Sequence, residues 1–157
     1  MNIMLKRITI ILLFSFLFVL AGCGKSDAER EQLEIKAQEI VRCFDEKDYK
    51  SLKILFSERT LLDAPNIDEQ IQLAFDAYEG KSTSYRFSYL GMDGSQVDGV
   101  WTDQHTIVKI NSLKTDCQKT YVISYTEYLV YNDDKRVVGI IGMSLRDENN
   151  NVLAVIG

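Results

Sequence analysis

The sequence is poor in the residues that most often carry enzymatic chemistry. Its 157 residues include one histidine, three cysteines, one proline and one tryptophan. A serine hydrolase triad would have to use His105, and no serine lies in a nucleophile-elbow context. No closely spaced pair of cysteine or histidine begins a zinc site, and no Gly-rich phosphate loop is present. The sequence therefore predicts neither a metal site nor a cofactor.

Basic residues are also in the minority. The chain has 18 lysines and arginines against 23 aspartates and glutamates, for a net charge of −5. Proteins bind nucleic acid and anionic lipid headgroups through clustered lysines and arginines, and the sequence shows no basic stripe. With 46% hydrophobic residues the composition is that of a globular chain. We therefore expect a folded domain without a nucleic-acid partner.

The longest apolar run is short and lies near the N-terminus. Lys6 and Arg7 precede an apolar stretch from Ile8 to Val19, which is the layout of a secretory signal. A transmembrane helix needs about 20 apolar residues, so a lasting membrane span is not expected. Removal of residues 1–22 would take away two basic residues and no acidic one. The remaining 16 basic and 23 acidic residues give the mature chain a net charge of −7.

The apolar run ends in Leu20-Ala21-Gly22-Cys23, which resembles the lipobox of bacterial lipoproteins. The resemblance implies a diacylglyceryl thioether on Cys23, cleavage between Gly22 and Cys23, and an acyl chain such as palmitate on the new N-terminus. Two or more acyl chains hold a protein stably at a membrane, whereas one does not. We expect a lipid-anchored protein on the outer, extracytoplasmic face of the cell membrane, with residues 23–27 as lipidated N-terminus and tether. The alternative is an ordinary secretory signal cut nearby.

Three helices are predicted at the start of the domain, which we expect to cover residues 28–157. Ser26 and Glu29 have the form of a capping box that opens the first helix. Asp48 can cap a second, shorter helix, and a loop with Pro65 leads to a third helix opened by Asn66. The apolar sides of the first and third helices recur at helical spacing: Leu33, Ala37, Ile40, Val41 and Phe44, then Ile67, Ile71, Ala74, Phe75 and Tyr78.

From Lys81 the apolar period changes to two, which predicts strands. A glycine-containing loop from 91 to 99 separates the first strand from the rest. The later strands are expected at His105–Leu113, Thr120–Tyr131, Arg136–Arg146 and Val152–Ile156. Helices in one block and strands in another favour an α+β fold. We expect three N-terminal helices packed on a curved antiparallel sheet of about four to five strands, with a cone-like shape.

The alternation of the strands places one carboxylate among aromatic side chains. If Tyr85 and Phe87 face the helices, Tyr125 and Glu127 share that face, with these further members: Tyr89, Val108, Ile110, Tyr121, Ile123, Val137, Ile141, Met143 and Leu145. A carboxylate on an apolar face is costly unless it is paired or solvated. Tyr85, Phe87, Tyr125 and Glu127 are therefore candidate ligand-binding residues of a cavity. The alternative, which we favour, is an ordinary aromatic core with Glu127 at the exposed end of the sheet.

Two further groups of side chains have a conceivable chemistry. His105 lies close to Asp103, and such a pair can serve acid–base catalysis, but we expect a solvent-facing histidine at a strand end. Cys43 and Cys117 are the thiols that remain beside Cys23, and outside the cytoplasm such a pair can form a disulfide. Cys43 flanks the apolar side of a helix whereas Cys117 lies in a predicted turn, so we expect two unpaired thiols.

The segment from Glu39 to Asp48, followed by Leu52, Leu55 and Phe56, resembles the opening of nuclear transport factor 2-like (cystatin-like) domains. The resemblance implies a first helix that ends at an acidic residue and a second helix that brings apolar residues over a cone-shaped cavity. The chain is also similar to a family of uncharacterised Firmicute lipoproteins whose domain has no assigned function, and no catalytic residue follows from this similarity. Besides the segment above, it is carried by Asp68–Ile71, Tyr78–Lys81, Lys114–Asp116, Lys119–Tyr121 and Ile156–Gly157. Cys117 departs from the small turn residue expected there.

Three classes of function agree with these observations. We favour a noncatalytic, membrane-anchored domain that binds a small ligand or an envelope protein through a cavity or through the outer face of the sheet. A small lyase-like or isomerase-like enzyme is the second class, and it would need Glu127, a tyrosine or His105 to converge on one pocket. A structural envelope protein is the third class.

Overall fold

The computed structural model describes residues 24–157. The chain divides into two units with a boundary between Lys36 and Ala37. The described part of the first unit is the beginning of helix α2 (Gly24–Glu46), and the residues of this helix from Ala37 onward belong to the second unit. The stretch expected as a tether up to Asp27 is thus helical from Gly24. No helix within the described residues is long and apolar enough to cross a membrane. Cys23 and the expected leader lie outside the described residues.

The helices of the second unit follow the predicted apolar pattern. After α2 come α3 (Tyr49–Lys53), α4 (Glu58–Asp63) and α5 (Ile67–Ala77). The predicted apolar residues of α2 from Ala37 onward are buried, as are those of α5 together with Tyr78. Helix α3 begins where the sequence predicts, because the Asp48 carboxylate accepts a hydrogen bond from the Ser51 backbone N–H at 3.1 Å.

The described chain has four α-helices rather than the three predicted. Helix α4 occupies the stretch expected to be a loop before Pro65. Its N-cap is Ser57, whose hydroxyl accepts a hydrogen bond from the Thr60 N–H at 3.1 Å. A serine at this position is a helix-start signal, but six residues are too few to show a helical period. The sequence therefore did not predict α4, whereas the predicted loop with Pro65 is present between α4 and α5.

Six strands form one antiparallel sheet in the described chain, in the order β1-β3-β4-β5-β6 with β2 beside β3. Their bounds are β1 (Ser82–Tyr89), β2 (Asp93–Val97), β3 (Val100–Thr115), β4 (Thr120–Tyr131), β5 (Gly139–Asp147) and β6 (Val152–Ile156). The α+β class is thus confirmed, but the count of four to five strands is wrong. Strand β2 forms inside the expected glycine loop, because it pairs with the first residues of β3, with Asp93 opposite His105.

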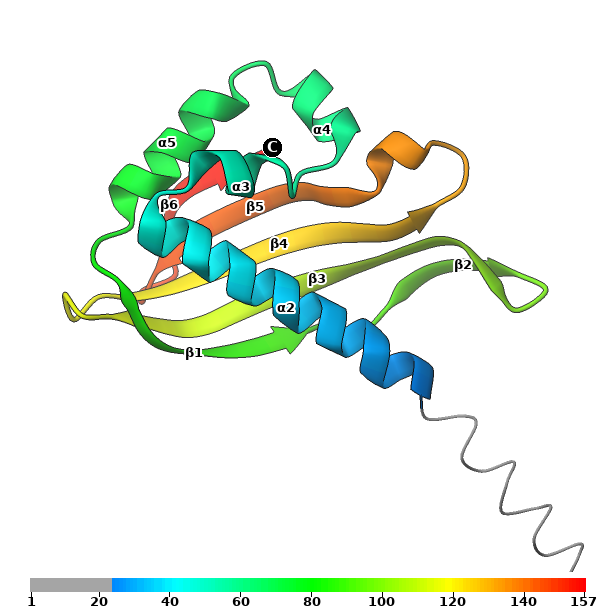
Figure 1. Ribbon diagram of the computed structural model, residues 1–157, viewed down its shortest axis with the longest axis horizontal. Helices are drawn as coiled ribbons and strands as arrows, with labels where there is room; N and C mark the ends of the chain where they lie inside the picture. The colour runs from blue at the N-terminus through cyan, green and yellow to red at the C-terminus, as the bar shows by residue number, and fades with distance from the viewer. Residues whose placement is uncertain (1–23) are drawn as a thin grey trace, which may run out of the picture. The chain divides into compact units, whose positions relative to one another are not determined.

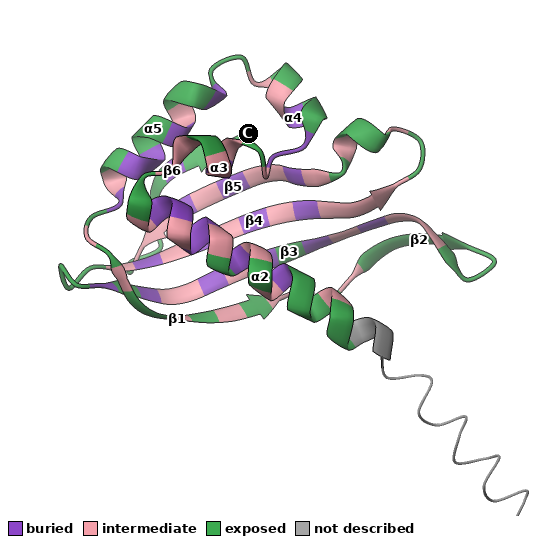
Figure 2. Ribbon diagram, in the orientation of Figure 1, coloured by how far each residue is buried: buried purple, intermediate pink, exposed green. Residues whose placement is uncertain are grey.

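The sheet has two different faces. Buried residues alternate with half-exposed and exposed ones along the strands (Figure 2). The buried side chains define an inner face, which packs with the helices: α5 contacts β6, and α4 contacts β5 (Figure 1). Ring contacts from Phe44 to Tyr78 and from Tyr78 to Tyr121 join the end of α2 to β4, with centroid distances of 5.4 and 5.0 Å. The opposite side of the sheet is the outer face.

A β-bulge in β5 changes which side chains reach the inner face. Thr126 pairs with Gly142 and Glu127 pairs with Ile140, so that Ile141 is an extra residue of β5. Ile140 is therefore buried in place of Ile141. Val137 lies outside β5 altogether, in a short 3₁₀ helix, η1 (Lys135–Val137). The prediction that Ile141 and Val137 face inward is wrong, because strict alternation does not anticipate a bulge or a late strand start.

Candidate functional site

Two of the predicted pocket residues lie side by side on the inner face. Tyr125 and Glu127 are two residues apart on β4, and each is 1% exposed. Glu127 pairs with Thr106 of β3 on one side and with Ile140 of β5 on the other. The buried position of Glu127 contradicts the alternative that we favoured, in which this carboxylate lies at the exposed end of the sheet.

The other two predicted pocket residues lie on the edge strand β1. Tyr85 and Phe87 are half-buried, and the register pairs Phe87 with Ile110. Tyr125 instead lies opposite Val108, whose partner on β1 is Tyr89. The structure therefore brings Tyr125 and Glu127 together and places Phe87 in the neighbouring row of side chains.

The inner face around Tyr125 is unusually polar for a protein interior. Gln104 and Thr106 are buried there as well, and the Thr106 hydroxyl donates to the Gly91 carbonyl at 2.6 Å. Burial, together with the nearby charge of Glu127, raises the pKa of the Tyr125 hydroxyl, which therefore remains a neutral donor at physiological pH. Within the described residues neither this hydroxyl nor the Gln104 Nε2 has a hydrogen-bond partner. The Tyr125 hydroxyl and the Gln104 amide can therefore donate hydrogen bonds, and Glu127 adds a carboxylate to the same cluster.

His105 lies on the other side of the sheet. Its neighbours Gln104 and Thr106 are buried on the inner face, so the alternation of β3 directs His105 outward. Its Nδ1 is 3.5 Å from the Asp103 carboxylate, and its ring is 5.0 Å from that of Tyr128. The Asp103–His105 pair thus exists, but His105 and Glu127 face opposite sides of the sheet and cannot serve one pocket.

The two cysteines of the second unit are free thiols within the described chain. Cys43 is buried in α2, and burial followed by the charge of Glu39 raises its thiol pKa to about 12. Cys117 is exposed in the turn after β3. Among the described residues, no group of three or more histidine, cysteine, aspartate or glutamate side chains could hold a metal ion.

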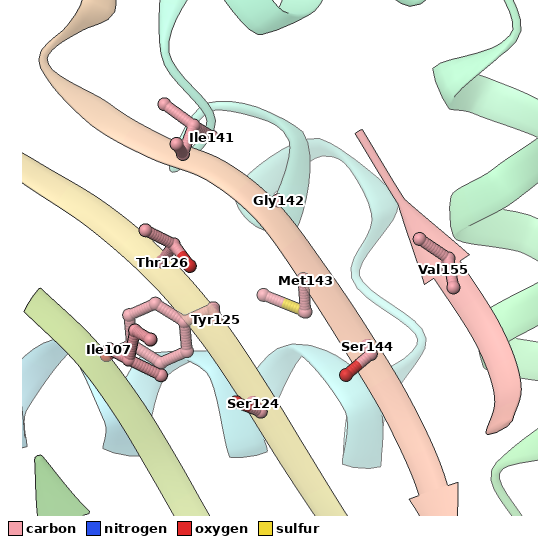
Figure 3. Close-up of a pocket in the computed structure, with 9 residues that line it drawn as sticks. All are labelled: Ile107, Ser124, Tyr125, Thr126, Ile141, Gly142, Met143, Ser144 and Val155. Atoms are coloured by element: carbon pink, nitrogen blue, oxygen red, sulfur yellow. The ribbon is translucent and has the colours of Figure 1, made fainter. Parts of the chain in front are cut away.

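The outer face has a hollow that sequence reasoning missed. Its volume is about 330 Å³, and these residues line it (Figure 3): Ile107, Ser124, Tyr125, Thr126, Ile141, Gly142, Met143, Ser144 and Val155. The bulge at Ile141 bends β5 at this point, and Gly142 has no side chain to fill the space opposite Thr126. A Cβ atom on Gly142 would lie 3.9 Å from its nearest neighbour, the Ile156 carbonyl oxygen, which is an ordinary van der Waals distance, so the position has room for a side chain. Gly142 lies within a predicted strand, and a glycine at such a position was the sequence signal that could have indicated this hollow.

The lining of the hollow changes from apolar to polar along the strands. One row across the sheet consists of Ile107, Thr126 and Gly142, with Ile141 beside them. The adjacent row consists of Lys109, Ser124, Ser144 and Val155. One end of the hollow therefore presents aliphatic groups, and the other presents the hydroxyls of Ser124 and Ser144, with Lys109 on the neighbouring strand opposite Ser124.

A second hollow of about 350 Å³ lies where the β3–β4 and β5–β6 turns meet, and it is lined by Ala77, Glu79, Gln118, Lys119, Thr120, Tyr121, Asp147, Glu148, Asn149 and Leu153. Several of its charged groups already interact with protein atoms. The Asp147 carboxylate accepts from the backbone N–H groups of Asn149 and Asn151, and Lys119 lies 3.9 Å from Glu79. We interpret this cluster as one that stabilises the turns, and we take the outer-face hollow as the candidate site.

Comparison with known proteins gives one family. The family model described as "Domain of unknown function (DUF5104)" matches residues 39–148, which are 110 of the 157 residues. The chain belongs to this family. The DUF5104 match begins at Glu39, the first residue of the segment on which the resemblance to an uncharacterised family rested, and it contains every lining residue of the outer-face hollow except Val155. A search of curated proteins finds no match.

Proposed function

We propose that this protein is a noncatalytic binding domain, anchored by lipid to the outer face of the cell membrane, and that the outer-face hollow is its binding site. The hollow at the Thr126–Gly142 pair carries the proposal. Sites for small molecules are typically concave, mostly apolar and about 300–1,000 Å³ in volume, with a few placed polar groups. The outer-face hollow agrees with this description in volume, in its aliphatic walls and in its serine and threonine hydroxyls.

The proposed anchor rests on the lipobox-like Leu20-Ala21-Gly22-Cys23 and on the short apolar run before it. Lipid on Cys23 would attach to the residue that is joined to Gly24, the first described residue of α2. A domain held in this way meets ligands outside the cytoplasm. Its partners would be small molecules or segments of other envelope proteins.

We also propose a nuclear transport factor 2-like architecture. Helices packed on one face of an antiparallel sheet, as found in the second unit, support this proposal. That superfamily has a cone-shaped cavity under its helices. The hollow that we propose as the binding site lies on the other face.

A small lyase-like or isomerase-like enzyme is the second candidate, and the adjacent burial of Tyr125 and Glu127 is the observation that favours it. Such an enzyme would bind its substrate on the inner face and would work without His105. Ligand mapping distinguishes the two candidates, since they use opposite faces of the sheet.

The experiment uses the ¹⁵N-labelled mature chain with Cys23→Ser, titrated with three neutral probes: isopropanol, cyclohexanol and phenol. We expect saturable shifts of the backbone amide signals of Thr126, Gly142 and Ser144. Gly142→Leu should abolish these shifts by filling the hollow. The matched control Ser84→Leu adds the same side chain to an exposed position of β1 and should leave them unchanged. Shifts centred on Gln104 and Thr106 would favour the enzyme, and the absence of saturable shifts would contradict a binding site in the hollow.

A further inference from the structure

Part of the outer face, away from β2 and from Asp103 at the start of β3, carries only positive charge although the protein is acidic. Four basic residues lie in the strand segments 82–89, 107–114, 120–126, 141–146 and 152–156, namely Arg86, Lys109, Lys114 and Arg146, and these segments contain no aspartate or glutamate. The whole chain has a net charge of −5. The sequence shows no basic stripe because these four residues are spread over 61 positions from 86 to 146, and only strand pairing brings them onto one surface.

These four side chains have no acidic partners among the described residues. The hydrogen bonds that they form go to neutral oxygens. Arg86 donates to the Ser112 hydroxyl at 3.3 Å, and Arg146 donates to the Asn150 carbonyl at 3.2 Å. Their positive charges are therefore not paired with carboxylates within the described chain and favour anions over this part of the outer face.

One of these basic residues, Lys109, does not line the hollow itself but pairs with a residue that does. Lys109 lies opposite Ser124, which in turn lies opposite Ser144, so an ammonium group and two hydroxyls share one row. The next row contains Thr126 and Gly142. The apolar side chains of Ile107 and Ile141 lie at its two ends. Adjacent rows on one face of a sheet are about 7 Å apart, which is the length of a few methylene groups.

From this arrangement we infer that the outer-face hollow binds a short amphiphilic anion, whose carboxylate or phosphate group lies at Lys109, Ser124 and Ser144 and whose aliphatic chain lies over Gly142 between Ile107 and Ile141. This inference rests on the proposed binding function and adds the chemical class of the ligand. Hydroxyls and an ammonium group are donors for an anionic oxygen. The aliphatic walls and the open space above Gly142 remove the chain from water.

The test titrates octanoate, hexyl phosphate, 1-octanol and octyltrimethylammonium, each below its micellar concentration, into the ¹⁵N-labelled mature chain with Cys23→Ser. We expect octanoate and hexyl phosphate to bind more tightly than 1-octanol, and the cation to bind most weakly. Binding of the anions should weaken as salt is added, because salt screens charges at the surface. In both anion titrations the amide signals of Ser124, Thr126 and Gly142 should shift.

Two variants with the same change of charge locate the anionic group. Lys109→Glu should weaken octanoate binding about threefold to tenfold, as expected when an exposed favourable charge is reversed. Lys114→Glu is the matched control, since its partner Thr120 lies four residues from Ser124 along β4, or about 13 Å, which exceeds the screening length of about 8 Å at physiological salt. The control should bind octanoate nearly as the parent chain does.

The outcomes separate this inference from the proposed function. If 1-octanol binds as tightly as octanoate, and Lys109→Glu changes neither, the hollow binds ligands without selecting anions and this inference fails while the proposed function stands. Binding to phosphatidylglycerol vesicles without binding of monomeric octanoate would mean that the outer face binds a membrane surface. This result would also overturn the inference of a site for a short amphiphilic anion. Failure of the neutral probes described above would contradict the proposed function itself.

Discussion

Thr126 and Gly142 lie opposite each other on β4 and β5, directly beside the bulge residue Ile141, and the glycine leaves the outer face of the sheet open at this point. Six other glycines of the described chain have a positive φ, which favours glycine, namely Gly80, Gly91, Gly94, Gly99, Gly139 and Gly157. Gly94, for example, has a φ of +142°, and a Cβ there would lie 2.1 Å from the Asp103 carbonyl oxygen. Gly142 has neither a left-handed φ nor a close neighbour. The backbone therefore does not require a glycine at position 142, whereas the hollow depends on the absence of a side chain there.

Gly142→Ala should therefore stabilise the protein. Glycine inside a strand costs about 0.5–1 kcal/mol relative to alanine, because it loses more conformational freedom on folding. We expect urea denaturation to give a free energy of unfolding higher by about that amount. Gly94→Ala is the control, and it should lower the free energy of unfolding. Equal destabilisation by both substitutions would mean that Gly142 is also required by the backbone.

The two buried tyrosines Tyr78 and Tyr125 should respond differently to loss of their hydroxyls. The Tyr78 hydroxyl donates to the Asp45 carboxylate at 2.8 Å, whereas that of Tyr125 has no hydrogen-bond partner within the described residues. Tyr78→Phe should lower the free energy of unfolding by about 1.5–3 kcal/mol, the usual worth of a hydrogen bond to a charged group. Tyr125→Phe should leave it unchanged or raise it slightly in the same denaturation experiment. A large loss for Tyr125→Phe would reveal a partner for its hydroxyl.

Asp48 should stabilise the protein in a pH-dependent way. Hydrogen bonds from the Ser51 side chain and backbone, and then the Arg42 guanidinium, lower the Asp48 pKa from its ordinary 3.8 to about 2. A carboxyl group with a depressed pKa in the folded state stabilises fully above pH 3.8, and this contribution is lost as the pH falls through about 2. Asp48→Asn should thus lower the Tm at pH 7, and the difference from the parent chain should shrink between pH 4 and pH 2. Asp133→Asn, at an exposed turn position, controls for the loss of one negative charge. A Tm difference that stays constant down to pH 2 would be inconsistent with this role.

The two thiols of the second unit should differ in reactivity. Cys43 is buried with a thiol pKa of about 12. Desolvation and the charge of Asp116 also raise the thiol pKa of Cys117, but this residue is exposed, and reagents can reach it. Iodoacetamide at pH 8 should label Cys117 in the native Cys23→Ser chain and should reach Cys43 only in urea, because the thiolate is the nucleophile. Mass spectrometry counts the labels, and Cys117→Ser serves as the control. If urea without a reductant gives no label on either residue, the two cysteines form a disulfide.

Cys23→Ala should abolish the incorporation of labelled fatty acid and should leave an uncleaved or mislocalised precursor. The thiol is the acceptor of the diacylglyceryl group that the lipobox resemblance implies. The measurement is metabolic labelling with radioactive palmitate, followed by fractionation of the cells. Cys117→Ala removes the exposed thiol in the turn after β3 and should be labelled like the parent chain. Labelling that persists in Cys23→Ala would refute the lipid anchor.

The sequence by itself determined the elements whose signals are local. The apolar spacing of α5, the Asp48 cap of α3, and the bounds of β4 and β6 all agree with the structure. Each depends on the side chains of a single segment and on the period of that segment. The shared inward direction of Tyr125 and Glu127 also followed from alternation along one strand.

Only the tertiary structure decided the features that need two strands at once. Strand β2 exists because it pairs with β3, and the extra residue Ile141 exists because β5 is held in register with β4 on both sides of it. The hollow above Gly142 and the row from Lys109 to Ser144 therefore do not appear in any single segment of the sequence. Pairing between distant strands is a nonlocal interaction, and it gathers the aliphatic, hydroxyl and basic groups from which the proposed anion site is built.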